Sequence, residues 1–207
     1  MIKQSEIGGV LLAGGKASRM DFCDKALQPL HGEPLLAHCI RRARPQVRRL
    51  ILSVNHNAEL YQPFELPIVA DQDASYHGPL LGIYSAMRWF LQEQEDPGLK
   101  YLACFAADVP EFPADIVSEL AHSLGETSGR VAYVVHRGQI QPLFSLWHLD
   151  LANTLCGAIE SGLYGPKLLF ESLNAIAVVN KSSAPGAFFN INRDEDLSAA
   201  SRLIAKN

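Results

Sequence analysis

One stretch near the start of the chain decides the fold: Ile7-Gly8-Gly9-Val10-Leu11-Leu12-Ala13-Gly14-Gly15-Lys16-Ala17-Ser18-Arg19-Met20. Its first half, residues 7–13, is an apolar run of the length expected for one buried strand. The two glycines that follow it, Gly14 and Gly15, let backbone N–H groups approach an anion closely. The stretch therefore predicts a buried strand that ends in a phosphate-binding loop.

Three cations lie in this loop, within ten residues of one another: Lys16, Arg19 and Lys25. Such a density suits a triphosphate better than a single phosphate. The loop is not a Walker A motif, because Ala17 follows Gly15-Lys16, and it does not match G-x-G-x-x-G. Taken alone, a tight turn with solvated basic side chains is an equal alternative.

Beyond the loop, short apolar runs alternate with segments of helical periodicity. The pattern predicts strands over 7–13, 49–54, 67–70, 101–106, 131–136, 141–147 and 175–179. It predicts helices over 34–44, 58–61, 79–94, 113–124, 152–160, 167–173 and 194–204. This alternation indicates an α/β fold with a Rossmann-like doubly wound, mainly parallel sheet and helices on both faces.

Composition excludes several classes of protein. The 207 residues include 18 Lys and Arg against 22 Asp and Glu, a formal net charge of -4, which argues against a nucleic-acid partner. No apolar run approaches the roughly 20 residues that span a bilayer, and the N-terminus lacks a signal peptide's long apolar stretch. The four cysteines are far apart, so we expect no zinc site or disulfide framework and a cytoplasmic location.

In doubly wound sheets, ligands bind outside the carboxyl ends of the parallel strands. Three polar residues follow predicted strands: Asn55, Asp71 and Asp108. Each also has a simpler interpretation, because Asp108 could be a turn residue before Val109-Pro110 and Asp71 a solvated loop residue. The topology nevertheless predicts one site that these residues share with the glycine loop.

Four motifs resemble those of a known family. They are Leu12-Ala13-Gly14-Gly15-x-x-Ser18-Arg19-Met20-x-x-x-Asp24-Lys25, Gly78-Pro79-Leu80-Leu81-Gly82-Ile83, Ala107-Asp108-Val109-Pro110 and Phe189-Asn190-Ile191-Asn192-x-x-Glu195-Asp196-Leu197. The first resembles the signature loop of nucleotidyltransferases that activate sugar phosphates and related phosphates. Taken together, in this order, the four are most similar to molybdenum cofactor guanylyltransferases of the MobA type, whose fold is that of nucleotide-diphospho-sugar transferases.

The resemblance implies a role for each matching position. Backbone groups of three residues would contact guanine and ribose: Leu12, Ala13 and Gly14. Three others would surround the phosphates: Gly15, Arg19 and Lys25. Two would recognise the nucleotide, Asn55 and Asp71, while Asp108 would hold Mg²⁺ and complete a catalytic group with Arg19 and Lys25. Four would lie on the acceptor side or near the metal: Gln141, Pro142, Asn190 and Asn192.

The activity implied is Mg²⁺-dependent transfer of GMP from GTP to the phosphate of molybdenum-bound molybdopterin, with release of pyrophosphate. A single domain over 1–207 would place the nucleotide in a half of about 1–110 and the acceptor in 111–207. The expected partners are GTP, a molybdopterin-type phosphate and, transiently, other molybdenum-cofactor proteins, with no nucleic acid or membrane. We expect a monomer or weak oligomer.

Two departures from the family pattern leave alternatives open. Asp21 stands where the family has Gly, which places a carboxylate near the phosphates. Gly162-Leu163-Tyr164-Gly165-Pro166-Lys167 offers one cation where the family often has an Arg-rich acceptor segment. A cytidylyltransferase on the same cofactor, a sugar-phosphate or polyol-phosphate nucleotidyltransferase and a non-catalytic nucleotide-binding protein stay possible. So does a glycosyltransferase that uses Asp71-Gln72-Asp73 as its metal pair.

Overall fold

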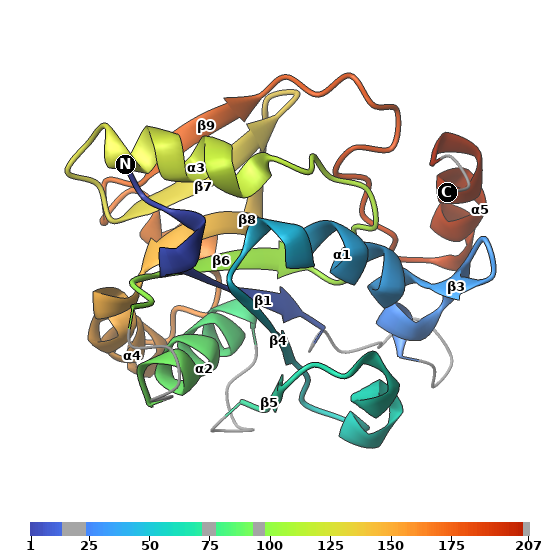
Figure 1. Ribbon diagram of the computed structural model, residues 1–207, viewed down its shortest axis with the longest axis horizontal. Coiled ribbons are helices and arrows are strands. Elements are labelled where there is room, and N and C mark those ends of the chain that lie inside the picture. Colours follow the sequence, from blue (N-terminus) through green and yellow to red (C-terminus); the bar gives the residue numbers. More distant parts are fainter. Residues whose placement is uncertain (14–23, 72–77, 93–97, 205–207) are drawn as a thin grey trace.

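A computed structural model describes residues 1–13, 24–71, 78–92 and 98–204 and contains a seven-stranded sheet of order β5-β4-β1-β6-β8-β7-β9 (Figure 1). The strands are β1 (Ile7–Leu12), β4 (Arg49–Ser53), β5 (Ile68–Val69), β6 (Tyr101–Ala106), β7 (Val131–His136), β8 (Gln139–His148) and β9 (Ile176–Asn180). Strands from both proposed halves of the chain therefore lie in one sheet.

Only β8 runs against its neighbours among these seven strands. β1 pairs in parallel with β4 and β6, β4 with β5, and β7 with β9, whereas β8 is antiparallel to both β6 and β7. The carboxyl ends of the other six strands consequently meet at one edge of the sheet. The prediction of a mainly parallel doubly wound sheet is confirmed.

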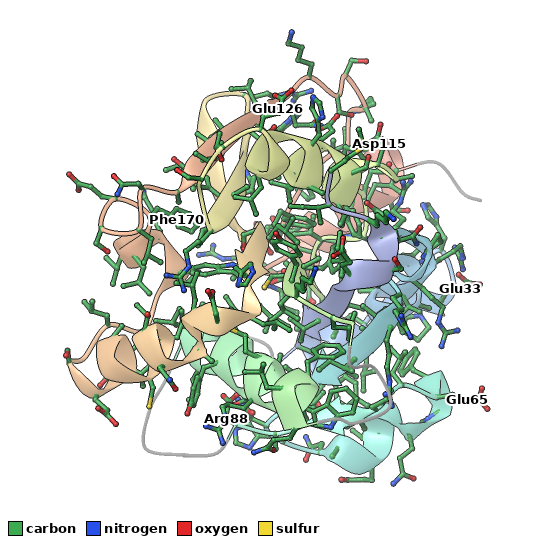
Figure 2. All side chains as sticks on the ribbon, turned by 60° about the vertical axis from the view of Figure 1, so that its left-hand side comes forward. Glu33, Glu65, Arg88, Asp115, Glu126 and Phe170 are labelled. Carbon is green, nitrogen blue, oxygen red and sulfur yellow. The ribbon has the colours of Figure 1, made fainter. Side chains whose placement is uncertain are left out.

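Helices cover both faces of this sheet, as predicted. On one face, α1 (Leu35–Ala43) and α3 (Ile116–Gly125) pack into a core that includes Leu36 and Leu120. On the other face, α2 (Pro79–Gln92) and α4 (Ala152–Glu160) pack into a second core (Figure 1). Side chains fill both layers, while Glu65 and Glu126 point outward (Figure 2).

The central strand β1 is packed closely on both faces because its second and third residues, Gly8 and Gly9, lack side chains. A Cβ atom on Gly8 would lie 2.7 Å from the Phe90 ring of α2, and one on Gly9 would lie 3.0 Å from Val47. A larger residue at Gly8 would push α2 away from the sheet, and one at Gly9 would displace the Val47 side chain on the other face. Gly8 thus permits the close approach of α2 to the strand that leads into the site.

Four smaller elements complete the N-terminal half of the structure. They are η1 (Gln4–Glu6), η2 (Lys25–Leu27), η3 (Arg44–Gln46) and η4 (Ala58–Phe64). A short hairpin of β2 (Pro29–Leu30) and β3 (Glu33–Pro34) supports α5 (Asp194–Leu203) through a separate small core that contains Leu30 and Ala200. Sequence patterns did not predict this hairpin, because its strands are two residues long.

Most predicted boundaries differ by a few residues from those observed, and two predicted helices are 3₁₀ segments instead. The segment 58–64 is a 3₁₀ helix rather than an α-helix and contains Pro63, which cannot donate a helical hydrogen bond. The predicted helix 167–173 is reduced to the 3₁₀ turn η6 (Pro166–Leu169), and a further 3₁₀ turn, η5 (Leu149–Leu151), precedes α4. On α2, Ile83, Met87 and Phe90 are buried as predicted, but Leu91 is 53% exposed.

No helix within the described ranges is long and apolar enough to cross a membrane.

Candidate active site

Side chains from two distant segments converge on the ammonium group of Lys25 at the carboxyl edge of the sheet. Lys25 Nζ lies 2.5 Å from Asp108 Oδ2, 2.6 Å from Asn192 Oδ1 and 3.4 Å from Asn190 Oδ1. We refer to Lys25, Asp108, Asn190 and Asn192 as the lysine cluster. Four residues predicted separately to bind phosphate, metal and acceptor thus meet at one ammonium group.

Lys25 is positioned by the residue before it. The Asp24 carbonyl accepts from Leu27 N–H, which closes the turn η2. The Asp24 carboxylate accepts a hydrogen bond of 3.1 Å from the Asn57 side chain. Asn57 has a left-handed backbone with φ of 52°, a conformation that Asn tolerates better than most residues. The segment after β4 therefore fixes the start of Lys25's turn.

Asp108 is held by its backbone surroundings. Ala107 N–H donates to the Leu12 carbonyl, and the Asp108 carbonyl accepts from Ile191 N–H at 3.0 Å. From α1, the Cys39 thiol lies 3.5 Å and 3.4 Å from the carbonyl oxygens of Ala107 and Val109. Burial, with a contribution from the Asp108 charge, raises the pKa of the Cys39 thiol, so it stays protonated and can donate.

The C-terminal asparagines reach the cluster because their segment is anchored on the loop after β6. Phe188 N–H donates to the Glu111 carbonyl, and Ile191 is fully buried between the two asparagines. The backbone N–H of Asn192 donates to the Asp196 carboxylate at 2.7 Å, at the first turn of α5. Both Asn side chains are thereby presented toward Lys25 from an exposed segment.

The oxygens of this cluster suit a hard divalent cation. One carboxylate and two amide carbonyl oxygens are ligands that Mg²⁺ and related ions accept, and Mg²⁺ commonly uses one or two carboxylates plus substrate phosphates. Across residues 1–13, 24–71, 78–92 and 98–204, no group of three or more His, Cys, Asp or Glu side chains could hold a metal. The donor chemistry therefore fits a site completed by a phosphate ligand.

A second polar pair joins the ends of two neighbouring strands. Asn55 Nδ2 donates to Asp71 Oδ2 at 2.6 Å, and Asp71 N–H donates to Asn55 Oδ1 at 3.0 Å. Asn55 follows β4 and Asp71 follows β5, so the reciprocal bonds connect these strand ends. The structure thus brings together the two residues predicted to recognise the nucleotide.

The remaining oxygen of Asp71 is enclosed by α2. Asp71 Oδ1 and Ser85 Oγ are buried and, among the described residues, neither has a partner of hydrogen-bond geometry. A Cβ atom on Gly82 would lie 3.7 Å from this same oxygen and 2.9 Å from both Leu12 and Ser53. Burial raises the pKa of the Asp71 carboxyl above its ordinary value, although the nearby Asn55 and Ser85 side chains act to lower it.

The proposed acceptor residues Gln141 and Pro142 lie on β8, at the same edge of the sheet. Gln141 pairs with Val134 of β7, next to an irregularity in the β7–β8 register. The β6–β8 pairing ends at Cys104 and Ser145, and the Pro142 carbonyl accepts from the Ser145 hydroxyl. No described contact joins these two residues to the lysine cluster, so their acceptor role stays a prediction.

The segment with a single cation, residues 162–167, docks on the N-terminus of α2. The Tyr164 carbonyl accepts from Leu80 N–H at 3.0 Å. A Cβ atom on Gly78 would lie 2.5 Å from that carbonyl oxygen, and Gly78 has φ of 149°, which favours glycine. A segment expected in the acceptor half therefore packs against the nucleotide half, while Lys167 is exposed.

Three predicted site residues, Gly14, Gly15 and Arg19, lie outside the described residues, as do Lys16 and Asp21. The carbonyl of Leu12 and the N–H of Ala13 extend the sheet, through bonds to Ala107 and Ser53. Sequence reasoning did not identify the supporting residues Cys39, Asn57 and Ser85. Only their position relative to Asp108, Lys25 and Asp71 reveals their part in the site.

The sequence comparisons show which proteins the chain is similar to. A family model described as the MobA-like NTP transferase domain matches residues 9–175. A molybdenum cofactor guanylyltransferase from Burkholderia ambifaria is 36% identical, over 95% of this chain and 96% of that protein. One from Shewanella sediminis is 33% identical, over 97% and 98%.

Solved structures agree on the fold. Molybdopterin-guanine dinucleotide biosynthesis protein A from Archaeoglobus fulgidus superposes with a TM-score of 0.75 at 22% identity, over 94% of this chain and 97% of that one. A 4-diphosphocytidyl-2C-methyl-D-erythritol synthase from Anaerococcus prevotii gives 0.73 at 13% identity, over 96% of each chain. At these identities the likeness concerns architecture alone.

Proposed function

The chain belongs to the MobA-like NTP transferase family, and from this premise we propose that it is a molybdenum cofactor guanylyltransferase. It transfers GMP from GTP to the phosphate of molybdenum-bound molybdopterin and releases pyrophosphate. The observation that most supports this activity is the lysine cluster, which joins a cation, a carboxylate and two amide oxygens at the edge where β1 ends. Relatives that match nearly the whole chain have this activity in their names.

The reaction needs no general base on the protein. A phosphate monoester has a second pKa near ~6, so an oxygen of the acceptor phosphate is mostly deprotonated at neutral pH. That oxygen attacks the α-phosphorus of GTP, a new P–O bond forms, and the bond to the β-phosphate breaks with its electrons leaving on pyrophosphate. The protein's task is to position mutually repelling anions and to offset their charge.

In this proposal Lys25 neutralises phosphate charge, together with Arg19 from the glycine loop. Asp108, Asn190 and Asn192 would hold a divalent cation, which we propose is Mg²⁺. When bound, Mg²⁺ would offset the charge that develops on the phosphate oxygens. Cys39 and the Ile191 N–H keep the Asp108 turn in place while substrates bind.

The Asn55–Asp71 pair supports recognition of the nucleotide. The carboxylate cannot rotate freely, because Asn55 bonds both its Oδ2 and the Asp71 backbone N–H. Oδ2 of the fixed carboxylate keeps a second lone pair, which can accept a hydrogen bond from an N–H group of guanine. Cytosine and uracil would place their N–H groups differently there. Donor choice in this proposal therefore depends on the ends of β4 and β5.

Two measurements test the proposal. Thermal unfolding with GTP, CTP, UTP or ATP in the presence of Mg²⁺ should show the largest stabilisation with GTP. Incubation with GTP, Mg²⁺ and molybdenum-bound molybdopterin should yield the guanine dinucleotide and one pyrophosphate per product. A preference for CTP in both assays would replace the guanylyl assignment with a cytidylyl one. Binding of GTP without any product would favour a non-catalytic nucleotide-binding protein.

A further inference from the structure

Lys25 has no hydrogen-bond donor left for a substrate in the observed arrangement. A lysine ammonium carries three N–H donors and no acceptor. The lysine cluster provides three oxygens, from Asp108, Asn190 and Asn192, at 2.5, 3.4 and 2.6 Å from Nζ. A group proposed to neutralise the phosphates of GTP is thus fully engaged by the protein itself.

These three oxygens are also the ligands that fit a divalent cation. The ammonium lies among them, and the same lone pairs would have to face a metal ion bound there. Two cations that compete for one set of oxygens also repel each other. Occupancy by Lys25 and occupancy by a metal therefore exclude one another at this cluster.

We propose that Lys25 is a resident placeholder cation that leaves the cluster when a divalent metal binds. The inference rests on the proposed function, because it takes the metal to be the one that the reaction uses. In the metal-free protein, Lys25 pairs with Asp108 and holds the three segments together. Release of Lys25 by the metal makes its three donors available at the edge of the sheet where the triphosphate would lie.

The arrangement has a consequence that a simple phosphate-binding lysine would not have. Lys25 lowers the protein's affinity for the metal in the absence of nucleotide, because the metal must first displace it. The metal and the nucleotide then favour each other, since phosphates give the displaced ammonium a new partner. Lys25 would thus set the metal affinity, as the cation that the metal displaces, and would bind phosphate after its release.

The first test measures Mn²⁺ binding alone, by electron paramagnetic resonance of free Mn²⁺ titrated into the nucleotide-free protein. Lys25→Met removes the ammonium and keeps an unbranched side chain of similar length. Its matched control is Lys100→Met, which removes the same charge from a surface ion pair with Glu6. Lys100 directly precedes β6, whereas Asp108 follows the other end of that strand. We expect Lys25→Met to bind Mn²⁺ about tenfold more tightly than wild type, and Lys100→Met to bind it within about twofold of wild type.

Addition of Asp108→Asn to Lys25→Met should abolish the tighter binding, which would locate the ion at the cluster. Equal affinities of Lys25→Met and Lys100→Met would overturn the proposal, as would weaker binding by Lys25→Met. Urea unfolding of each variant shows whether it is folded before Mn²⁺ is added.

The second test uses the wild-type chain and does not depend on any variant. Acetylation by a succinimidyl ester, followed peptide by peptide in a mass spectrometer, reports how accessible each lysine amine is. The Lys25 side chain is 19% exposed and that of Lys100 is 60% exposed. Saturating Mn²⁺ should accelerate acetylation of Lys25 severalfold and leave Lys100 unchanged. An unchanged or slower rate at Lys25 contradicts its release.

Neither test contains a nucleotide or a pterin. A wrong assignment of GTP or of the acceptor would therefore leave both results intact, and failure of the placeholder inference would leave the proposed reaction standing.

Discussion

Two polar groups at the same edge of the sheet differ in the sequence separation of their residues and in how their carboxylates are stabilised. The Asn55–Asp71 pair joins residues 16 apart in sequence and encloses one carboxylate oxygen without a cation. The lysine cluster joins residues 83, 165 and 167 apart and balances its carboxylate with an ammonium. The first, which we call the clamp, is a short-range pair in which burial disfavours the charged form of the Asp71 carboxyl. The second is a long-range cluster in which the Lys25 ammonium balances the Asp108 carboxylate. In our proposal a metal ion can replace that ammonium.

The difference indicates how the two groups would serve one reaction. A clamp with fixed, partly desolvated hydrogen bonds favours recognition of a neutral base edge, because its geometry changes little when the ligand binds. A partly exposed cluster of charge and amide oxygens can exchange one cation for another at low cost.

The largest effect is expected from Asp108→Ala, which removes the only carboxylate in the lysine cluster. Pyrophosphate release should fall by at least about 100-fold, the usual size of effect when a charge-stabilising group is lost. Binding of GTP should persist, because the Asn55–Asp71 clamp is untouched. Asp115→Ala, at an exposed aspartate before α3, is the control and should retain wild-type turnover. Full turnover by Asp108→Ala would show that the cluster does not act in catalysis.

Asn55→Ala breaks the clamp instead of the cluster. It leaves Asp71 Oδ2, which is partly buried, without its donor, and such a loss should cost about 1 kcal/mol, the lower end of the range for buried groups. Urea unfolding measures the loss of stability, and the KM for GTP should rise more than kcat falls. Asn153→Ala, at an exposed position of α4, should change neither quantity. A drop in kcat at unchanged KM would contradict this division, because Asn55 would then act in catalysis with the lysine cluster rather than in binding of the nucleotide.

Asp71→Asn tests whether burial is what distinguishes the clamp. The pKa of Asp71 is raised above its ordinary 3.8 in the folded protein, chiefly by burial. The stabilising effect of its protonated form is present at low pH and is lost as pH rises through the raised pKa. The neutral Asn should therefore be more stable than Asp by up to about 1 kcal/mol near neutrality, and the gain should shrink toward about pH 4. Unfolding measured across that range checks the sign, and a gain that grows as pH falls contradicts it.

Cys39→Ala should give the smallest effect on activity. It removes a weak S–H donor from the two carbonyls that flank Asp108, so kcat should fall by about two- to fivefold. Cys104→Ala is the matched control, because it deletes an equally buried thiol from β6 away from the Asp108 turn. Both variants should lose similar stability, but only Cys39→Ala should slow turnover. Equal kinetics would mean that the Asp108 turn needs no support from α1.

Much of the fold followed from pattern, because each predicted apolar run became a strand of the sheet, from the buried central strand β1 to the half-exposed edge strand β9. The Asp71 and Asp108 positions were predictable from the rule that strand ends hold ligands. The motif likeness brought in Lys25, Asn190 and Asn192, but without saying that they touch one another.

The supporting residues were not predictable for physical reasons. Cys39 looks like an ordinary core residue of α1, and only tertiary packing turns its thiol toward the Asp108 turn. Ser85 lies on a helix face whose other members are apolar, so periodicity says nothing about the carboxylate that it meets. The docking of Tyr164 on α2 depends on a backbone approach permitted by Gly78, which no side-chain pattern records.

The bond from Ile191 N–H to the Asp108 carbonyl also has a consequence for biosynthesis. A growing chain can pair β1 with β4 and β6 well before residues 190–192 leave the ribosome. The clamp at Asn55 and Asp71 can form on such a nascent chain, whereas the lysine cluster cannot. A nascent or truncated chain would thus contain the nucleotide-recognition pair without the lysine cluster. Metal binding at the cluster would become possible only after Asn192 has been synthesised.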